Sequence, residues 1–179
     1  MIRLFAALPV PDDIADRLIP LQTGLDGARW RDREHFHVTL AFFGEMEEPV
    51  AEMLDEEIGA LVSPQLDLEI EGVGWFGRKE PHAVFATVKR TPELDQLARD
   101  CRKISARMGL DKDDKPFKPH ITLAYLNNTP LDAAMAWSER WQVLRAGPWT
   151  ADRFHLVESI TREGKRSVYE AVADYPLGR

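Results

Sequence analysis

The chain contains the sequence HVTLAFFG at residues 37–44 and a near copy of it, HITLAYLN, at residues 120–127. Four positions are identical between the two copies, and Val/Ile and Phe/Tyr pairs occupy two more. The copies lie 83 residues apart in a chain of 179 residues, a spacing much larger than the period of solenoid repeats. The recurrence therefore predicts a duplicated half, with two pseudo-symmetric lobes whose equivalent strands face a shared central cleft.

Each copy predicts a strand with one reactive face. Side chains alternate between the two faces of a strand, so His37 and Thr39 share one face, as do His120 and Thr122 in the second copy. The aliphatic residues between them point toward the core. A single His-x-Thr on a strand is more often a chance match than a site. Two copies at duplicated positions favour a site made from these four side chains.

Two histidines in one cleft can act as an acid and a base. The unperturbed imidazole pKa of about 6.5 allows proton transfer near neutral pH. In hydrolysis of a cyclic phosphodiester, one imidazole can deprotonate the attacking water while the other protonates the departing ribose oxygen. The hydroxyls of Thr39 and Thr122 can donate to the non-bridging phosphate oxygens. This scheme needs no metal and no cofactor.

A zinc site is the competing use of histidine side chains. It requires several of the five histidines to converge, namely His35, His37, His82, His120 and His155, and no predicted helix carries a His-x-x-x-His pair. We therefore favour acid-base chemistry, and we interpret His35, His82 and His155 as surface or structural residues.

Hydrophobic periodicity predicts an α+β fold of mainly antiparallel sheet with outer helices, because the strands do not alternate strictly with helices. Strand patterns occupy residues 1–8, 36–43, 66–71, 81–89, 120–126, 153–159 and 167–173. Apolar residues at helical spacing mark helices over residues 14–25, 50–61 and 94–108, the last of them ended by Gly109. Hairpin turns are expected at 77–80 and 161–165, and a polar loop at 111–115.

The composition indicates one compact domain over residues 1–179, since 44% of the residues are hydrophobic and can bury a core. The formal net charge of -7 argues against a broad surface for long nucleic acid. Cys101 is the single cysteine, which excludes a disulfide framework and indicates a reducing compartment. The N-terminal apolar run is too short for a signal peptide, and no stretch approaches the roughly 20 apolar residues of a spanning helix. We expect a soluble, cytoplasmic monomer without a membrane partner.

The two motifs and their flanks, Phe43–Glu45 and Phe117–Pro119, resemble those of the 2H phosphoesterase superfamily. Within it, the chain is most similar to the bacterial RNA 2',3'-cyclic phosphodiesterase family, also called 2'-5' RNA ligase. The similarity extends to residues 3–8 (RLFAAL), 72–76 (GVGWF) and 156–159 (LVES), and so spans nearly the whole chain.

This resemblance implies a bilobal α+β fold with a central cleft, and opening of a 2',3'-cyclic phosphate to a 2'-phosphomonoester. It implies that His37 donates a proton to the 3' oxygen and that His120 accepts a proton from water, roles that the symmetric motifs alone do not separate. It also implies reversible joining of RNA ends through a 2'-5' linkage. The expected partners are RNA ends or small nucleotides that carry a cyclic phosphate.

One position departs from the family pattern. The second motif of the family commonly continues Thr-Leu-Ala-Arg, and Tyr125 stands in the place of that arginine. Strand alternation puts Tyr125 on the face opposite His120 and Thr122, in the core or at the rim. Other basic residues are candidates to supply the charge: Lys118, Arg162, Lys165 and Arg166.

Base stacking needs an aromatic side chain near the cleft. Alternation puts Phe43 on the face of His37, so we take Phe43, with Lys118, as a substrate-binding candidate beside the two threonines. The weaker aromatic candidates are Trp75, Phe76 and Phe117, whereas packing roles are assigned to Trp137, Trp141 and Trp149.

Two other functions stay open at this point. A nucleotide-binding module with little catalysis is compatible with the absent arginine. A different 2H substrate, such as a 2'-5' oligonucleotide or a cyclic ADP-ribose phosphate, is compatible with the same motifs.

Overall fold

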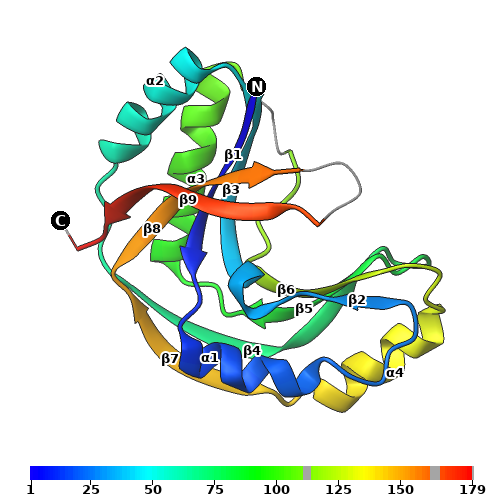
Figure 1. The fold of residues 1–179 in the computed structure, drawn as a ribbon. Helices are drawn as coiled ribbons and strands as arrows, with labels where there is room; N and C mark the ends of the chain where they lie inside the picture. Colours follow the sequence, from blue (N-terminus) through cyan, green and yellow to red (C-terminus); the bar gives the residue numbers. More distant parts are fainter. Residues whose placement is uncertain (111–113, 162–165, 179) are drawn as a thin grey trace.

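A computed structural model describes residues 1–110, 114–161 and 166–178, and in them two antiparallel sheets with helices on their outer sides (Figure 1). The first sheet has the strand order β3-β1-β8-β9 and the second has the order β2-β6-β5-β4-β7. The predicted α+β class is therefore confirmed. Residues 111–113 of the expected polar loop and 162–165 of the expected hairpin turn lie outside the described residues.

The strands of the first sheet are β1 (Ile2–Pro9), β3 (His37–Met46), β8 (Arg153–Ile160) and β9 (Val168–Pro176). Those of the second sheet are β2 (Ala28–Trp30), β4 (Leu66–Phe76), β5 (Ala83–Val88), β6 (His120–Leu126) and β7 (Arg145–Ala151). The α-helices are α1 (Asp12–Leu18), α2 (Glu48–Gly59), α3 (Pro92–Arg107) and α4 (Leu131–Trp141).

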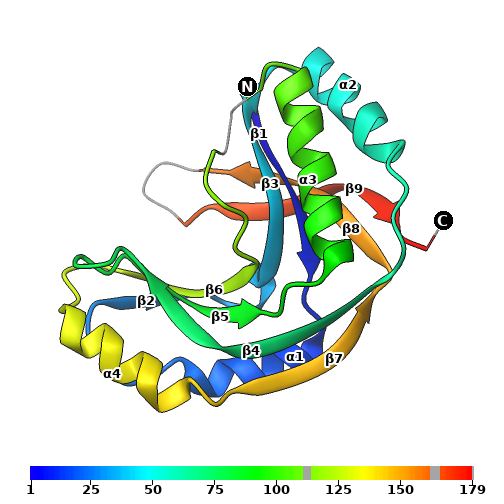
Figure 2. The same ribbon diagram turned by 180° about the vertical axis from the view of Figure 1, so that it is seen from behind.

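Each lobe is built from both halves of the chain. Helices α2 and α3 pack against the first sheet, whereas α1 and α4 pack against the second, as the two opposite views show (Figures 1 and 2). Strand β1 lies in the first sheet, but the helix that follows it, α1, covers the second. Strand β5 lies in the second sheet, but the helix that follows it, α3, covers the first. The two halves are thus interleaved.

Helix α3 forms where the apolar spacing predicted it. Thr91 is the N-cap, and its hydroxyl accepts a hydrogen bond of 3.2 Å from the backbone N–H of Leu94. Pro92 follows at the first helical position, where its missing N–H costs nothing. Gly109, with φ of +67°, comes just past the end of the helix and suits a left-handed conformation.

The helix expected over residues 14–25 is shorter than predicted. It ends at Leu18 and continues only as a 3-10 turn, Ile19–Leu21. Pro20 is the physical reason, because proline has no N–H to donate and its ring clashes with the preceding turn. The apolar residues of the expected stripe are nevertheless buried, so the prediction of a packed face is correct.

Two strands and one α-helix were not predicted from the sequence. Strand β2 has only three residues, and β7 contains the cis Gly147-Pro148 bond, which interrupts the usual strand pattern. Helix α4 buries Ala134 and Trp137 and was missed although Pro130 and Asp132 mark its start. The packing roles expected for the tryptophans are confirmed, since Trp137 and Trp149 are buried and Trp141 packs against the same core. Across the described residues, every helix is too short or too polar to cross a membrane.

Candidate active site

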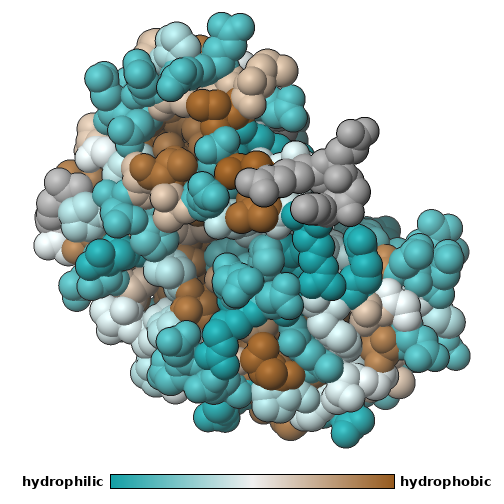
Figure 3. Space-filling view, in the orientation of Figure 1, coloured by the Kyte–Doolittle hydropathy of each residue, from teal (hydrophilic) through white to brown (hydrophobic). Residues whose placement is uncertain are grey.

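Both motif histidines lie in one cleft between the two sheets. Strand β3 carries His37 and strand β6 carries His120, and these two strands are close neighbours although they belong to different sheets. The cleft has a volume of about 540 Å³, and His37, Thr39, His120 and Thr122 all line it. The surface between the two lobes is mainly hydrophilic (Figure 3). The structure thus brings together the four side chains that the duplicated motif singles out.

The two imidazoles are held in the same way. Nδ1 of His37 lies 2.7 Å from the carbonyl oxygen of His35, and Nδ1 of His120 lies 2.6 Å from that of Lys118. A carbonyl oxygen only accepts hydrogen bonds, so each Nδ1 carries the proton and donates it. Each Nε2 is therefore the nitrogen available to exchange a proton with a substrate.

An aromatic ring packs against each histidine from the neighbouring strand. The ring of Phe5, on β1, lies 5.0 Å from that of His37, and the ring of Phe85, on β5, lies 5.1 Å from that of His120. These apolar rings limit the rotation of the imidazoles and exclude water from one side of each. The two-fold repetition therefore includes the packing around the histidines as well as the motif.

Burial lowers the pKa of both histidines. For His37 the pKa falls to about 4, chiefly by burial, and the nearby charge of Arg31 lowers it further. For His120 burial also lowers the pKa, with a smaller contribution from the charge of Lys118. The hydrogen bonds to the backbone carbonyls act in the opposite direction in both cases. Both imidazoles are thus neutral at pH 7 in the free cleft, and a phosphate anion bound between them would raise both pKa values.

The threonine hydroxyls are available to a ligand. Thr39 and Thr122 are half-buried in the cleft wall, and neither side chain hydrogen-bonds to another residue in the described part of the chain. Each lies two residues beyond a histidine on the same face. They are therefore placed to donate to oxygens of an anion that lies between the imidazoles.

A β-bulge occurs at the same position in both motif strands. In the β1–β3 pair, Ala6 faces Ala41 and Ala7 faces Thr39, which leaves Leu40 without a partner. The β5–β6 pair skips Leu123 in the same way. A bulge inserts one extra residue into a strand and so shifts the alternation of side chains beyond it.

The duplicated bulge corrects two expectations based on simple alternation. Phe43 does not share the face of His37, because it is 1% exposed and belongs to the core, whereas Phe42 is 48% exposed and lines the cleft. Tyr125 does not lie on the strand face opposite His120. Its side chain is 40% exposed and lines the cleft on the same side as His120. Phe42 and Tyr125 occupy equivalent positions of the two motifs.

The cleft is cationic although the chain is acidic overall. Its lining residues include four arginines, Arg3, Arg29, Arg31 and Arg166, and no aspartate or glutamate within the described residues. Of the basic candidates expected from the sequence, Arg166 is in the lining, where it pairs with Asp32 at 3.1 Å. Lys118 is outside it, with Nζ over the rings of Phe76 and Phe85. The other two, Arg162 and Lys165, lie outside the described residues.

Arg31 has a distinctive environment within this cleft. Its guanidinium lies between two tyrosine rings, with Cζ 5.4 Å from the centroid of Tyr125 and 5.5 Å from that of Tyr169. Tyr125 is on the second sheet and Tyr169 on the first, so Arg31 connects the two lobes. Its Nη2 is buried and has no hydrogen-bond acceptor among the described residues. The sequence gives no sign of this role, because Arg31 lies outside both motifs.

The other histidines and aromatic candidates lie in and around the cleft. His35 and His82, expected as surface or structural residues, line the cleft; His82 is exposed there, and Nε2 of His35 lies 3.1 Å from the carbonyl oxygen of Ser167. His155 is elsewhere and contacts Asp174. Phe76 packs edge-on against His120, with centroids 4.9 Å apart, whereas Trp75 and Phe117 are not in the cleft lining.

Within the described residues, side chains that could bind a metal ion cluster at one place. The ligand atoms of Asp32, Glu34 and His35 lie within 4.8 Å of one another, and this group includes neither motif histidine. The cleft is instead lined by the two motif imidazoles, the two motif hydroxyls and the guanidinium of Arg31. Such a set suits a phosphate ester better than a metal ion.

Two antiparallel lobes with a His-x-Thr strand in each define the class of 2H phosphoesterases. A model of the 2'-5' RNA ligase superfamily matches residues 10–163. The chain belongs to this superfamily.

Known relatives cover most of the chain. The RNA 2',3'-cyclic phosphodiesterase of Aeropyrum pernix is 30% identical over 168 residues, which make up 90% of this chain and 92% of that protein. The protein of the same name from Escherichia coli is 31% identical over 68% of this chain and 70% of its own length. The crystal structure of E. coli LigT complexed with 3'-AMP has a TM-score of 0.81 at 26% identity, and covers 99% of both chains.

Proposed function

We propose that the chain hydrolyses 2',3'-cyclic phosphates at RNA ends to 2'-phosphomonoesters, without a metal, by acid-base catalysis between His37 and His120. The observation that carries the proposal is their equivalent geometry, with each Nδ1 bonded to the backbone carbonyl two residues before the histidine and each Nε2 left for the substrate. The relatives named for this activity support the substrate class.

The proposed mechanism gives each of the four motif side chains one role. His120 accepts a proton from the attacking water, and the oxygen of that water forms a bond to phosphorus. The bound phosphate raises the pKa of His37, so that His37 carries a second proton on Nε2 in the complex. The bond between phosphorus and the 3' oxygen breaks, and His37 donates this Nε2 proton to that oxygen and becomes neutral. Thr39 and Thr122 donate hydrogen bonds to the non-bridging oxygens, where negative charge grows in the transition state. The assignment of acid and base follows the resemblance to the family, since the local geometry is symmetric.

Arg31 supplies the cation of the site. The family's arginine is replaced by Tyr125, but the ring of Tyr125 holds the guanidinium of Arg31 in the same cleft. A phosphate oxygen would provide an acceptor for this guanidinium, whose Nη2 otherwise stays unsatisfied. This charge also opposes protonation of His37 in the free protein and so favours release of its proton in the reaction.

The pKa shifts predict a characteristic pH dependence. The profile of kcat/KM reports the free protein, in which the pKa of His37 is about 4 and that of His120 is also lowered. We therefore expect the optimum of kcat/KM below pH ~6.5, the ordinary pKa of histidine. The optimum of kcat should lie at higher pH, because the bound phosphate raises both pKa values.

The decisive experiment is product analysis on an oligonucleotide that ends in a 2',3'-cyclic phosphate, with EDTA present. We expect a 2'-phosphate end, and loss of turnover in His37→Ala and in His120→Ala with circular dichroism unchanged. His155→Ala is the matched control, since His155 lies outside the cleft and should keep full activity. Full activity in both motif variants would refute the two-histidine mechanism, and loss of activity in EDTA would refute its metal independence.

The remaining parts of the proposal have separate tests. The same in-line chemistry with a 5' hydroxyl in place of water joins the two ends through a 2'-5' bond, as the bond from phosphorus to the 3' oxygen breaks and that oxygen takes a proton. Incubation of the two ends at high concentration would detect this product. All groups of the site come from one chain, so we propose an active monomer of a single domain, testable by sedimentation and by cooperative unfolding. Nucleotide binding without product over long incubation would instead favour a binding module.

A further inference from the structure

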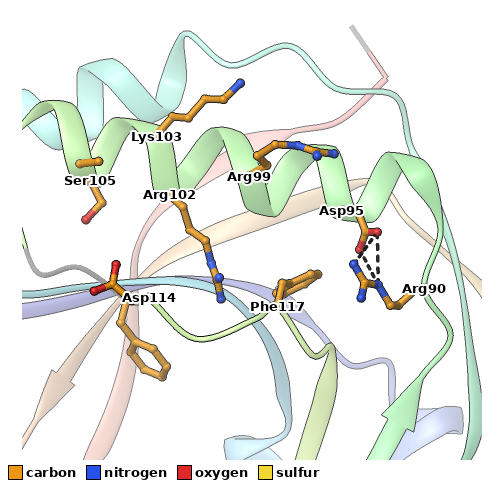
Figure 4. Close-up of a pocket in the computed structure, with 10 residues that line it drawn as sticks. Arg90, Asp95, Arg99, Arg102, Lys103, Ser105, Asp114 and Phe117 are labelled. Carbon is orange, nitrogen blue, oxygen red and sulfur yellow. Dashed lines mark hydrogen bonds and ion pairs between the residues drawn. The ribbon is translucent and has the colours of Figure 1, made fainter.

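A second hollow, the α3 groove, lies beside helix α3 and has a volume of about 550 Å³. Its walls come from α3, from Arg90 just before it, and from Asp114 and Phe117 on the way to β6. Figure 4 shows Arg102 projecting from α3 toward Phe117, with Arg90 and Asp95 joined at the other end. The groove contains neither motif histidine and is distinct from the catalytic cleft.

The α3 groove and the catalytic cleft meet at Phe42, which lines both of them. Strand β3 is an edge strand of the first sheet, and Phe42 is exposed at this edge to both hollows. The bulge described above is what exposes Phe42. A ligand that extends beyond the cleft at this point therefore passes over an aromatic ring into the groove.

The α3 groove carries a positive balance on an acidic protein. Among the described residues, its lining includes four cations, Arg90, Arg99, Arg102 and Lys103, and two acids, Asp95 and Asp114. Arg90 is neutralised by Asp95 at 2.9 Å, and Lys103 points away from Arg102 and Phe117 toward the other side of the helix (Figure 4).

Two arginines are the groups of the groove best suited to a nucleic acid strand. Arg99 is exposed and makes no hydrogen bond or ion pair with another described residue. The guanidinium of Arg102 lies over the ring of Phe117, with Cζ 5.4 Å from its centroid, and its Nη1 donates a hydrogen bond of 2.8 Å to the carbonyl oxygen of Lys115. With Phe42 at the junction, the groove combines guanidinium groups with two aromatic side chains.

Guanidinium groups and aromatic rings together bind single-stranded nucleic acid, because the cations contact phosphates and the rings stack on bases. We propose that the α3 groove binds the RNA strand on the 5' side of the terminal nucleotide, while the cyclic phosphate occupies the catalytic cleft. This proposal rests on the proposed function. Binding in the groove would make the protein selective for an RNA end over a mononucleotide, because a mononucleotide occupies only the catalytic cleft.

The test compares two substrates in one charge-reversal variant, Arg99→Glu. The substrates are 2',3'-cyclic AMP and a short oligoadenylate that ends in a 2',3'-cyclic phosphate. We expect kcat/KM for the oligonucleotide to fall about tenfold and its dependence on salt to become weaker by about 0.7 in log-log slope for one lost phosphate contact. For the mononucleotide kcat/KM should change less than about twofold, because its phosphate does not reach the groove.

Arg140→Glu is the matched control, since Arg140 is an exposed helical arginine of α4 outside both hollows and its replacement changes the net charge equally. Equal losses of kcat/KM on both substrates in Arg99→Glu, or an unchanged kcat/KM on the oligonucleotide, would overturn the proposal for the groove. Turnover of the mononucleotide would still leave the proposed function intact. If the unmodified protein turns over neither substrate, the proposed function fails. Fluorescence anisotropy of the labelled oligonucleotide then tests whether the α3 groove binds RNA. Weaker binding in Arg99→Glu would support the groove proposal, and equal binding would refute it.

Discussion

Replacement of Arg31 by alanine tests the centre of the proposed site. Its guanidinium lies between the rings of Tyr125 and Tyr169, and its buried Nη2 lacks an acceptor among the described residues. A charge-assisted hydrogen bond to a phosphate contributes about 2 to 3 kcal/mol in a partly buried site. Loss of that bond corresponds to a fall in kcat/KM of roughly 30- to 150-fold.

The stability of the same variant should change little, because two effects oppose each other. Removal of Arg31 abolishes two cation–π contacts, each of which contributes about 0.5 to 1 kcal/mol. It also removes a buried donor without an acceptor, which costs the folded state about 1 to 3 kcal/mol. We therefore expect the free energy of unfolding, measured in urea, to stay within about 1 kcal/mol of the unmodified value.

A control and a refutation follow from the geometry. Arg140 also lies over an aromatic ring, with Cζ 4.9 Å from the centroid of the Trp141 side chain, but it is far from the cleft. Arg140→Ala should leave kcat/KM for 2',3'-cyclic AMP within about twofold, whereas Arg31→Lys should recover part of the loss by keeping a charge. If Arg31→Ala folds normally and stays within about threefold of full activity, Arg31 does not bind the phosphate.

Three further predictions concern single side chains. The pKa of His37, about 4, lies below its unfolded value, so the folded protein binds fewer protons between these pH values and the free energy of unfolding falls as pH drops. In urea unfolding, the free energy of unfolding should fall by about 2 kcal/mol between pH ~7 and ~4.5 because of this group. The His37→Gln variant should not show this fall. Phe43→Ala should lose about 3 to 5 kcal/mol of stability, whereas Phe42→Ala should stay folded and raise KM for a nucleotide about tenfold; the reverse outcome would contradict the bulge. Thr39→Val and Thr122→Val should each lower kcat about tenfold to a hundredfold with unchanged unfolding, and an unaffected kcat would remove that hydroxyl from the mechanism.

The sequence predicted most of the fold because its periodic stretches agree with the final packing. Helix α3 has a cap, a proline at its start, a regular apolar stripe and a terminal glycine, so local and tertiary preferences coincide. Strand β7 was missed because Gly147 and Pro148 are unusual within a strand. The end of α1 was misplaced because the buried apolar spacing continues past Pro20 although the helical hydrogen bonds do not.

The site was predictable only as far as the duplicated motif reaches. Alternation within the first three residues of each copy places the histidines and threonines correctly. It fails beyond Leu40 and Leu123, because a bulge is defined by pairing with a neighbouring strand and has no sequence pattern of its own here. Arg31 and Tyr169 come from segments far from both motifs, so only the folded chain shows that they meet.

The exchange of helices between the lobes bears on how such a protein could arise. Helix α1 covers the sheet that holds β5 and β6, and α3 covers the sheet that holds β1 and β3. A primordial chain of half this length would have lacked one of the two helices that cover its own sheet. Two copies of that chain, with a helix of each packed on the sheet of the other, would have covered both sheets as an intertwined dimer. Gene fusion of such a dimer would keep this exchange of helices while allowing the two histidine strands to diverge.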